Sequence, residues 1–296
     1  MQAKRLVSTK ELSHEDWLEW RRKGIGGSDV AAICGMSRYR SPMEVYLDKL
    51  GELPPIEDNP KMKAGRMLEG VVADWFSEET GKKVCKRNFI FQHPEHKFMF
   101  ANIDRWVPGE NAGLECKTTS EYGRKDWSGS DQPTDFMEAP VEYILQCNHY
   151  MAVMGADRWY MAVLIGGWDF QWCVIERDES IIQMLIEKER EFWQTHVLNK
   201  VPPAYSFQDT DLLNQQLPES KSESIDLTED AYEIIQHLHQ SRKVKQQATE
   251  HENTAKNQIK ALMGLCEKAY WQGELAFTWK SNAKGNRVFK VIGGNE

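Results

Sequence analysis

Two neighbouring apolar segments of the sequence carry charged residues where a buried core is expected, and this feature constrains the fold most. Asp104 lies within Phe98–Val107, a stretch rich in Phe, Met, Ala, Ile, Trp and Val. Glu115 and Lys117 lie within Leu114–Thr119. Because alternate residues of a strand share a face, Glu115 and Lys117 are predicted to point the same way, opposite to the apolar face. Buried charges are costly without partners, so these groups require each other or a ligand.

Two polar residues on predicted helices join this group. Glu69 falls within or at the edge of the apolar stripe of a helix predicted over residues 64–80. Gln146 falls on a mostly apolar helix predicted from Pro140 to Met154, where a buried amide needs a hydrogen-bond partner. The sequence therefore predicts a cluster of three carboxylates and one lysine, with the amide of Gln146 beside it.

Such a cluster has two interpretations, which the residues alone leave equally open. Carboxylate oxygens are the ligands that Mg²⁺ and Mn²⁺ prefer, and both metals also bridge substrate phosphates. In that case Lys117 can orient a metal-bound water and stabilise the charge of the transition state. Alternatively, the acids and the lysine form a buried network that only specifies the fold.

A second candidate region is the glycine-rich stretch "RRKGIGGSDVAAICG", residues 21–35. It places a flexible turn and Ser28 ahead of a helix-like "SDVAAI". The Ser28 hydroxyl and the free N–H groups of that helix can hold a phosphate, and Arg21 lies seven residues upstream. The alternative is that Ser28 serves only as the N-cap of the helix.

The chain is predicted to divide into an α/β domain, residues 1–205, and a C-terminal extension, residues 206–296. Helical and strand patterns alternate through the first part, including a hairpin of "RWYMAVLI" and "DFQWCVIE" joined at a Gly-Gly turn. Residues 202–226 have the composition of a linker. A polar helical region of roughly 35 residues and a β-hairpin, "LAFTWKSNAKGNRVFKV", are predicted to follow.

Composition and charge restrict the class of protein. The net charge of -8 argues against a protein that coats nucleic acid non-specifically, because such binding depends on phosphate neutralisation; a nuclease remains possible. The apolar runs are of strand length, so neither a membrane span nor a secretion signal is expected. The six cysteines are scattered without a C-x-x-C pair, which predicts reduced core residues of a cytosolic protein.

Six segments together resemble a known family. In chain order they are "WLEWRRKGIGGSDVAAICGMSRYRSPMEVYLDKLG", "AGRMLEG", "NIDRWV", "GLECKTT", "YILQCNHYMAV" and "CVIERDE". They resemble the phage recombination exonucleases of the lambda exonuclease and YqaJ type, members of the PD-(D/E)XK nuclease superfamily, over roughly residues 15–200. The resemblance implies a restriction-endonuclease-like core with a mixed central sheet flanked by helices. It also implies an enzyme that degrades one strand of linear duplex DNA in the 5′-to-3′ direction with Mg²⁺, which Mn²⁺ can replace.

The resemblance assigns roles to the acidic cluster. Metal ligands would be Asp104, Glu115 and the backbone carbonyl of Cys116, with Glu69 binding directly or through water. Lys117 would activate the nucleophile. The sequence "NID" replaces the family's more usual proline-aspartate pair and leaves the role of the aspartate intact.

The remaining implications concern the substrate and partners. Gln146 would support the site, while Arg21 and Ser28 would grip the 5′-phosphate of a double-stranded DNA end. A single-strand annealing protein and a homo-trimeric ring are further expectations, in the cytoplasm of a bacterial host and with a phage or prophage origin. Three alternatives remain open: a structure-specific or nicking endonuclease, a non-catalytic scaffold that binds DNA ends, and a small-molecule enzyme using the same carboxylates with magnesium.

Overall fold

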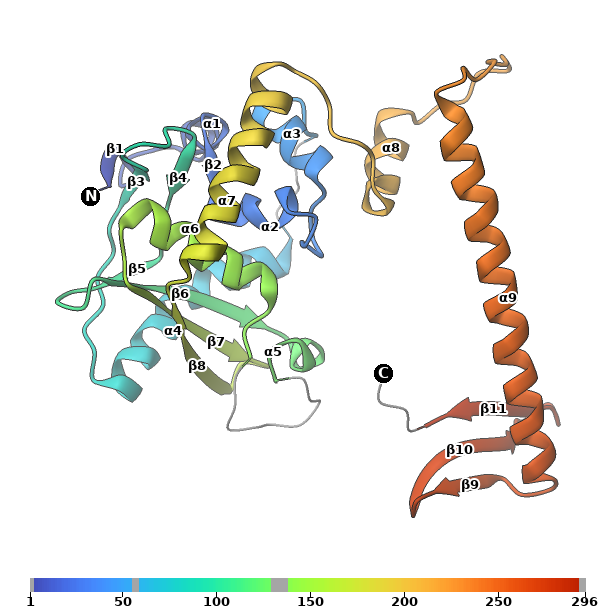
Figure 1. Cartoon of the computed structure of the whole chain (residues 1–296). Coiled ribbons are helices and arrows are strands. Elements are labelled where there is room, and N and C mark those ends of the chain that lie inside the picture. The colour runs from blue at the N-terminus through green and yellow to red at the C-terminus, as the bar shows by residue number, and fades with distance from the viewer. Residues whose placement is uncertain (1–2, 55–58, 129–137, 293–296) are drawn as a thin grey trace. The chain divides into compact units, whose positions relative to one another are not determined.

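A computed structural model describes residues 3–54, 59–128 and 138–292, and the chain divides into two compact units, residues 1–219 and 220–296 (Figure 1). The division lies later in the chain than the predicted boundary at residue 205. Residues just after that boundary belong to the first unit because the Ser41 hydroxyl donates a hydrogen bond to the buried Asp209 carboxylate. Leu212 also joins a core cluster of the first unit.

The helices of the first unit follow the predicted α/β alternation. They are α1 (His14–Arg22), α2 (Gly27–Ile33), α3 (Pro42–Leu50), α4 (Pro60–Thr80), α5 (Lys125–Ser128), α6 (Val141–Met154), α7 (Glu179–Phe192) and α8 (Thr210–Gln216). Short helical turns are η1 (Glu121–Gly123), η2 (Trp193–Leu198), which is a π-helix, and η3 (Phe207–Asp209).

Capping residues explain where several of these helices begin and end. Ser41 caps α3 and forms a reciprocal capping box with Glu44. Helices α3, α4 and α6 each end at a glycine with positive φ, namely Gly51, Gly81 and Gly155. This left-handed conformation is unfavourable for residues with a Cβ, so these glycines set the helix lengths.

Two four-stranded sheets complete the first unit. The first has the order β1 (Lys4–Ser8), β3 (Phe89–Gln92), β4 (Met99–Ala101), β2 (Ile25–Gly26). The second has the order β5 (Arg105–Val107), β6 (Ala112–Thr119), β7 (Arg158–Ile165), β8 (Asp169–Glu176). In the second sheet β6 and β7 are parallel, while β5 and β8 pair antiparallel at its edges. This is the mixed, helix-flanked sheet that the family resemblance implies.

The alternation along β6 and β7 divides the second sheet into two faces. Leu114 and Tyr160 share one core cluster with Val72 and Phe76 of α4. Side chains of the other parity, such as Met161, share a different cluster with residues of α6. Helices α4 and α6 therefore cover opposite faces, and Glu115 and Lys117 lie on the face covered by α6.

The predicted strand over Phe98–Val107 is wrong in one respect. It is broken into β4 and β5, which belong to different sheets, and Asp104 lies in the connection between them. The carboxylate of Asp104 accepts a hydrogen bond from the Cys116 N–H (2.9 Å), a contact made by a side chain rather than by a strand partner. A continuous apolar pattern does not reveal that a chain changes sheets.

The predicted core location of the cysteines is also only partly correct. All six are free, and Cys147 is buried, whereas Cys85 and Cys266 are exposed. An apolar neighbourhood in sequence does not ensure burial when the local element lies at an edge.

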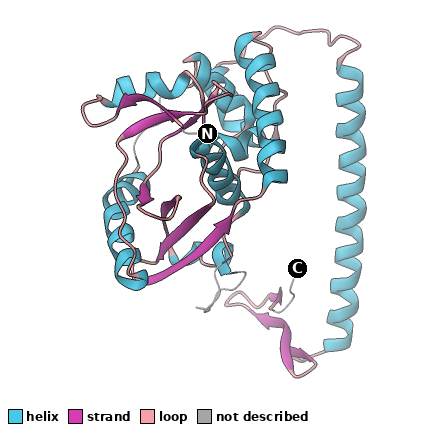
Figure 2. Cartoon of the chain, turned by 60° about the vertical axis from the view of Figure 1, so that its left-hand side comes forward, coloured by secondary structure: helices cyan, strands magenta, loops and turns pink. Residues whose placement is uncertain are grey.

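The second unit consists of a long helix and a small sheet. Helix α9 (Ala231–Met263) has 33 residues, and Figure 2 shows it as one continuous helix. An antiparallel sheet follows, with the order β11 (Arg287–Val291), β10 (Glu274–Ser281), β9 (Lys268–Trp271), so the predicted hairpin gains β9 as a third strand. Among the described helices of either unit, none combines the length and apolar character needed to cross a membrane.

Candidate active site

A pocket of about 210 Å³ in the first unit brings together most of the predicted site residues. Arg21 and Ser28 line it together with Asp104, Glu115 and Gln146. These residues come from α1, α2, the connection between β4 and β5, β6 and α6. Two regions that the sequence predicted separately, the glycine-rich stretch and the acidic cluster, therefore share one cavity.

Glu115 is the centre of the acidic cluster. It is only 4% exposed, and its Oε1 accepts hydrogen bonds from Lys117 Nζ (2.6 Å) and Gln146 Nε2 (2.8 Å). Its second oxygen, Oε2, is buried and has no hydrogen-bond partner among the residues that the structure describes. A buried carboxylate oxygen without a partner is unfavourable, so this atom is suited to accept a cation or a further donor.

Gln146 holds the cluster together from α6. Its side chain accepts from Lys117 Nζ (3.2 Å), and its amide nitrogen also donates to the Tyr150 hydroxyl (3.0 Å). The buried amide of Gln146 is therefore satisfied, and the predicted site lysine, Lys117, is one of its partners.

Asp104 lies close to Glu115 in a poorly solvated environment. Burial and the negative charge of Glu115 raise the pKa of Asp104 well above its ordinary value, and Lys117 offsets this only in part. The charged form of this acid is therefore under-stabilised by the protein alone. A bound cation would stabilise it, which is the electrostatic property expected of a metal ligand.

In Lys117, unlike Asp104, the neighbouring charges favour the ionised form. Burial lowers its pKa, but the carboxylates of Glu115 and Asp104 outweigh burial and raise the pKa above the ordinary range. Its ammonium also lies 4.5 Å from the ring centroid of Tyr143. Lys117 is therefore a fixed hydrogen-bond donor at neutral pH rather than a general base.

Glu69 is less central than the sequence predicted. It is a partly exposed residue of α4, and its carboxylate accepts a hydrogen bond from Arg105 Nη1 (2.5 Å). The same Arg105 nitrogen donates to the backbone carbonyl of Asp104 (2.8 Å). Glu69 thus lies beside the cluster but is neutralised by an arginine that the sequence analysis did not single out.

The carboxylates do not form a complete metal cage. In the described ranges of the chain, no three His, Cys, Asp or Glu side chains converge into a preformed metal site. The chemistry of the donors nevertheless fits a hard divalent cation, because Glu115 has a carboxylate oxygen without a partner in the described part of the chain and the pKa of the neighbouring Asp104 is raised.

The two predicted phosphate ligands contact each other. Arg21 Nη2 donates to the Ser28 hydroxyl (3.0 Å), and the Arg21 guanidinium lies 4.9 Å from the Trp17 ring. Helix α2 is capped by Gly26, so Ser28 is not its N-cap and the alternative reading of this serine is wrong. A Cβ on Gly27 would come within 2.5 Å of the Tyr150 ring, so only glycine permits this approach of α2 to α6.

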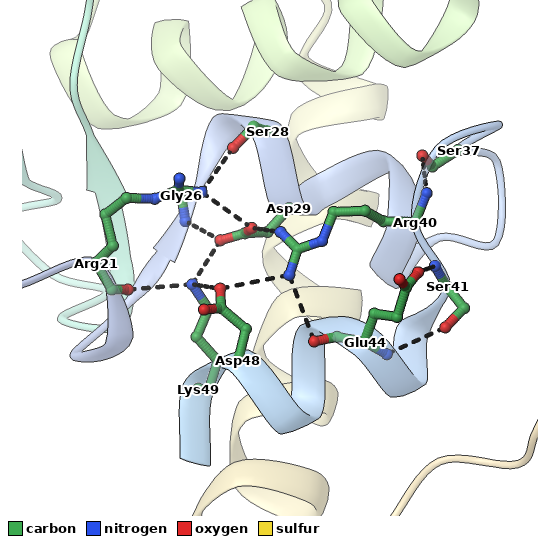
Figure 3. Close-up of polar contacts among 10 residues, drawn as sticks. All are labelled: Arg21, Gly26, Ser28, Asp29, Ser37, Arg40, Ser41, Glu44, Asp48 and Lys49. Carbon is green, nitrogen blue, oxygen red and sulfur yellow. Dashed lines mark hydrogen bonds and ion pairs between the residues drawn. The ribbon is translucent and has the colours of Figure 1, made fainter. Parts of the chain in front are cut away.

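A second buried carboxylate, Asp29, lies beside the pocket and was not predicted from the sequence. Asp29 directly follows Ser28 and is contacted by Arg21, Arg40 and Lys49 (Figure 3). The signal was present, because "SDVAAI" places an acid on an otherwise apolar helix, as Asp104 does in its own segment.

Comparisons with known proteins identify a family for this chain. The YqaJ-like viral recombinase domain matches residues 16–157. The uncharacterized protein YqaJ of Bacillus subtilis (strain 168) is 40% identical over 284 residues, which cover 93% of this chain and 86% of that protein.

Solved structures are similar at the level of the fold. LHK-Exo, an alkaline exonuclease from Laribacter hongkongensis solved in complex with dAMP, gives a TM-score of 0.51 at 20% identity, covering 69% of this chain and 98% of that one. A putative exonuclease from Eubacterium rectale gives a TM-score of 0.50 at 12% identity, covering 73% of this chain and 96% of that one. The core therefore has the PD-(D/E)XK nuclease fold. Because the chain is 40% identical to YqaJ over nearly its whole length, it belongs to the YqaJ-like viral recombinase family.

Proposed function

We propose that this protein is a metal-dependent exonuclease that degrades one strand of linear double-stranded DNA in the 5′-to-3′ direction. The observation that carries the proposal is the shared pocket, in which Arg21 and Ser28 lie in the same cavity as Asp104 and Glu115. A cavity with cationic and hydroxyl donors on one part and clustered carboxylates on another suits a phosphodiester substrate.

The metal belongs to the proposal. Asp104, Glu115 and the backbone carbonyl of Cys116 would hold Mg²⁺ or Mn²⁺, and Glu69 would join directly or through water once released from Arg105. A bound divalent ion supplies positive charge to the phosphate oxygens and makes its bound water more acidic.

The residues of the chain have distinct tasks in this reaction. Lys117, held by Glu115 and Gln146, donates a hydrogen bond that orients the attacking water and stabilises negative charge developing on the phosphate. Gln146 fixes both charged side chains in one geometry. Arg21 and Ser28 bind the 5′-terminal phosphate and so position the first phosphodiester bond.

The partners and setting are also part of the proposal. We infer that the enzyme acts on DNA ends in phage or prophage recombination, beside a single-strand annealing protein and in the cytoplasm of a bacterial host. A homo-trimeric ring would reconcile the net charge of -8 with continued contact with DNA, because enclosure of the duplex supplements phosphate attraction.

The test compares linear duplexes with 5′-phosphate or 5′-hydroxyl ends, in Mg²⁺ or EDTA, with a closed circular duplex alongside. We expect Mg²⁺-dependent release of mononucleotides, faster from phosphorylated ends. Lys117→Ala should reduce cleavage by about 10²–10³-fold or more while folding and DNA-end binding persist, because it removes one donor to the transition state.

Lys82→Ala is the matched control, since Lys82 pairs with a single carboxylate, Glu110, and does not line the pocket. Cutting of the closed circle would identify an endonuclease instead. End binding without hydrolysis would favour a non-catalytic scaffold, and loss of folding in Lys117→Ala would support a purely structural network.

A further inference from the structure

Asp29 is a fully buried carboxylate beside the pocket that the proposed reaction does not use. Its Oδ1 accepts from Arg21 Nη2 (3.4 Å) and Arg40 Nη1 (2.9 Å). Its Oδ2 accepts from Lys49 Nζ (2.6 Å) and the Gly26 N–H (3.0 Å). Figure 3 shows these side chains converging on Asp29 from α1, α3 and the segment between α2 and α3.

Lys49 connects this carboxylate to the main chain of Arg21. Its side chain is fully buried, and besides Asp29 its ammonium donates to the Arg21 backbone carbonyl (3.1 Å). Residue 21 is therefore held at two points: by Asp29 at its guanidinium and by Lys49 at its carbonyl. Burying a lysine is costly, so this arrangement exceeds what packing alone requires.

The Arg21 guanidinium is fixed along one side and open along the other. Nη2 is shared between Ser28 and Asp29, and the Trp17 ring lies against the group. Within the described part of the chain, Nη1 and Nε of Arg21 make no hydrogen bond, and the side chain is 27% exposed at the pocket. These free donors are available to an anion in the cavity.

The charged groups around Asp29 also favour binding of an anion at Arg21. Burial alone would raise the pKa of Asp29, but Lys49, Arg21 and Arg40 outweigh burial and hold it well below its ordinary value. Asp29 stays ionised, and three cations share it, with Asp48 contacting Arg40 and more distantly Lys49. Burial lowers the pKa of Lys49 despite Asp29, so the positive charge at the pocket is that of the Arg21 guanidinium.

We propose that Asp29 and Lys49 are positioning residues that fix the Arg21 guanidinium for the 5′-terminal phosphate of the DNA strand. This inference rests on the proposed function, because it assigns a determinant of end specificity to the same site. An arginine already ordered before binding loses less conformational entropy when it binds phosphate. The network therefore determines how strongly the enzyme prefers phosphorylated ends.

The test measures kcat and KM on 5′-phosphate and 5′-hydroxyl duplexes for the wild type, Asp29→Asn, Arg21→Ala and the double variant. We expect Asp29→Asn to raise KM for phosphorylated ends about tenfold, with kcat and all values for hydroxyl ends nearly unchanged, as for a lost charged hydrogen bond. The double variant should resemble Arg21→Ala, because Asp29 acts through Arg21.

Asp48→Asn is the matched control, since it removes a carboxylate from the same cluster without contacting Arg21. Cleavage of hydroxyl ends reports folding within each assay. Should Asp29→Asn not fold, Lys49→Gln gives the same test from the other point of attachment. An unchanged preference in the folded variant overturns the inference, whereas a wild type indifferent to end phosphorylation overturns the proposed phosphate grip itself.

Discussion

The first unit contains two buried acidic clusters on neighbouring elements, and their charges are balanced in opposite ways. Around Asp29, three cations and a backbone N–H satisfy both carboxylate oxygens, and the pKa is lowered. Around Asp104 and Glu115, several acids lie together, one Glu115 oxygen lacks a partner within the described ranges, and the pKa of Asp104 is raised. Both oxygens of the Asp29 carboxylate are therefore satisfied within the protein, whereas a Glu115 oxygen is left for a ligand to satisfy.

This difference separates two roles that a sequence cannot distinguish. A satisfied network orders side chains and so suits positioning, whereas an unsatisfied one stores unfavourable electrostatic energy that a ligand can relieve. Both clusters border the same pocket, through Arg21 in one case and through Glu115 in the other. We therefore expect substitutions and added metal to change the stability of the protein differently in the two clusters.

The largest effect on stability is expected from removing the buried cation of the complete cluster. Lys49→Met should destabilise the fold by about 3–5 kcal/mol, because it leaves Asp29 short of its closest partner in a buried site. Chemical denaturation of the variant against the wild type measures the loss. Lys82→Met is the control, since its more exposed ion pair with Glu110 contributes little. Equal unfolding free energies of Lys49→Met and Lys82→Met would mean that the pairing of Lys49 with Asp29 does not stabilise the fold.

A smaller effect is expected from adding metal to the incomplete cluster. Mg²⁺ should raise the melting temperature of the wild type relative to EDTA, by a stabilisation of about 2.7 kcal/mol at a hundredfold excess over Kd. Glu115→Gln should abolish this gain, because it removes the orphaned carboxylate oxygen. Asp48→Asn should retain the gain, as it changes a carboxylate of the other cluster. A Mg²⁺ response that survives in Glu115→Gln would place the metal elsewhere.

More of the cluster around Asp104 and Glu115 than of the cluster around Asp29 could be predicted from the sequence, and the reasons are physical. Asp104, Glu115 and Lys117 were found because acids on apolar segments and strand alternation are local signals. Lys49 was not found, because "LDKLG" near a helix end is typical of a solvated surface. Lys49 becomes buried only when α3 packs beside α1 and α2. The break between β4 and β5 and the pairing of Glu69 with Arg105 likewise depend on contacts between elements.

The smallest expected change in stability distinguishes the two clusters most clearly. Replacing an aspartate by asparagine should stabilise the fold in one cluster and destabilise it in the other. A raised pKa means that the folded protein favours the neutral acid, so Asp104→Asn in EDTA at neutral pH should stabilise the fold, by less than Mg²⁺ stabilises the wild type. The asparagine oxygen can still accept from the Cys116 N–H. A lowered pKa means that the fold favours the charged form, so Asp29→Asn should destabilise it. Melting temperatures of both variants in EDTA measure the signs, and a shared sign would show that the clusters do not differ in the way their geometry indicates.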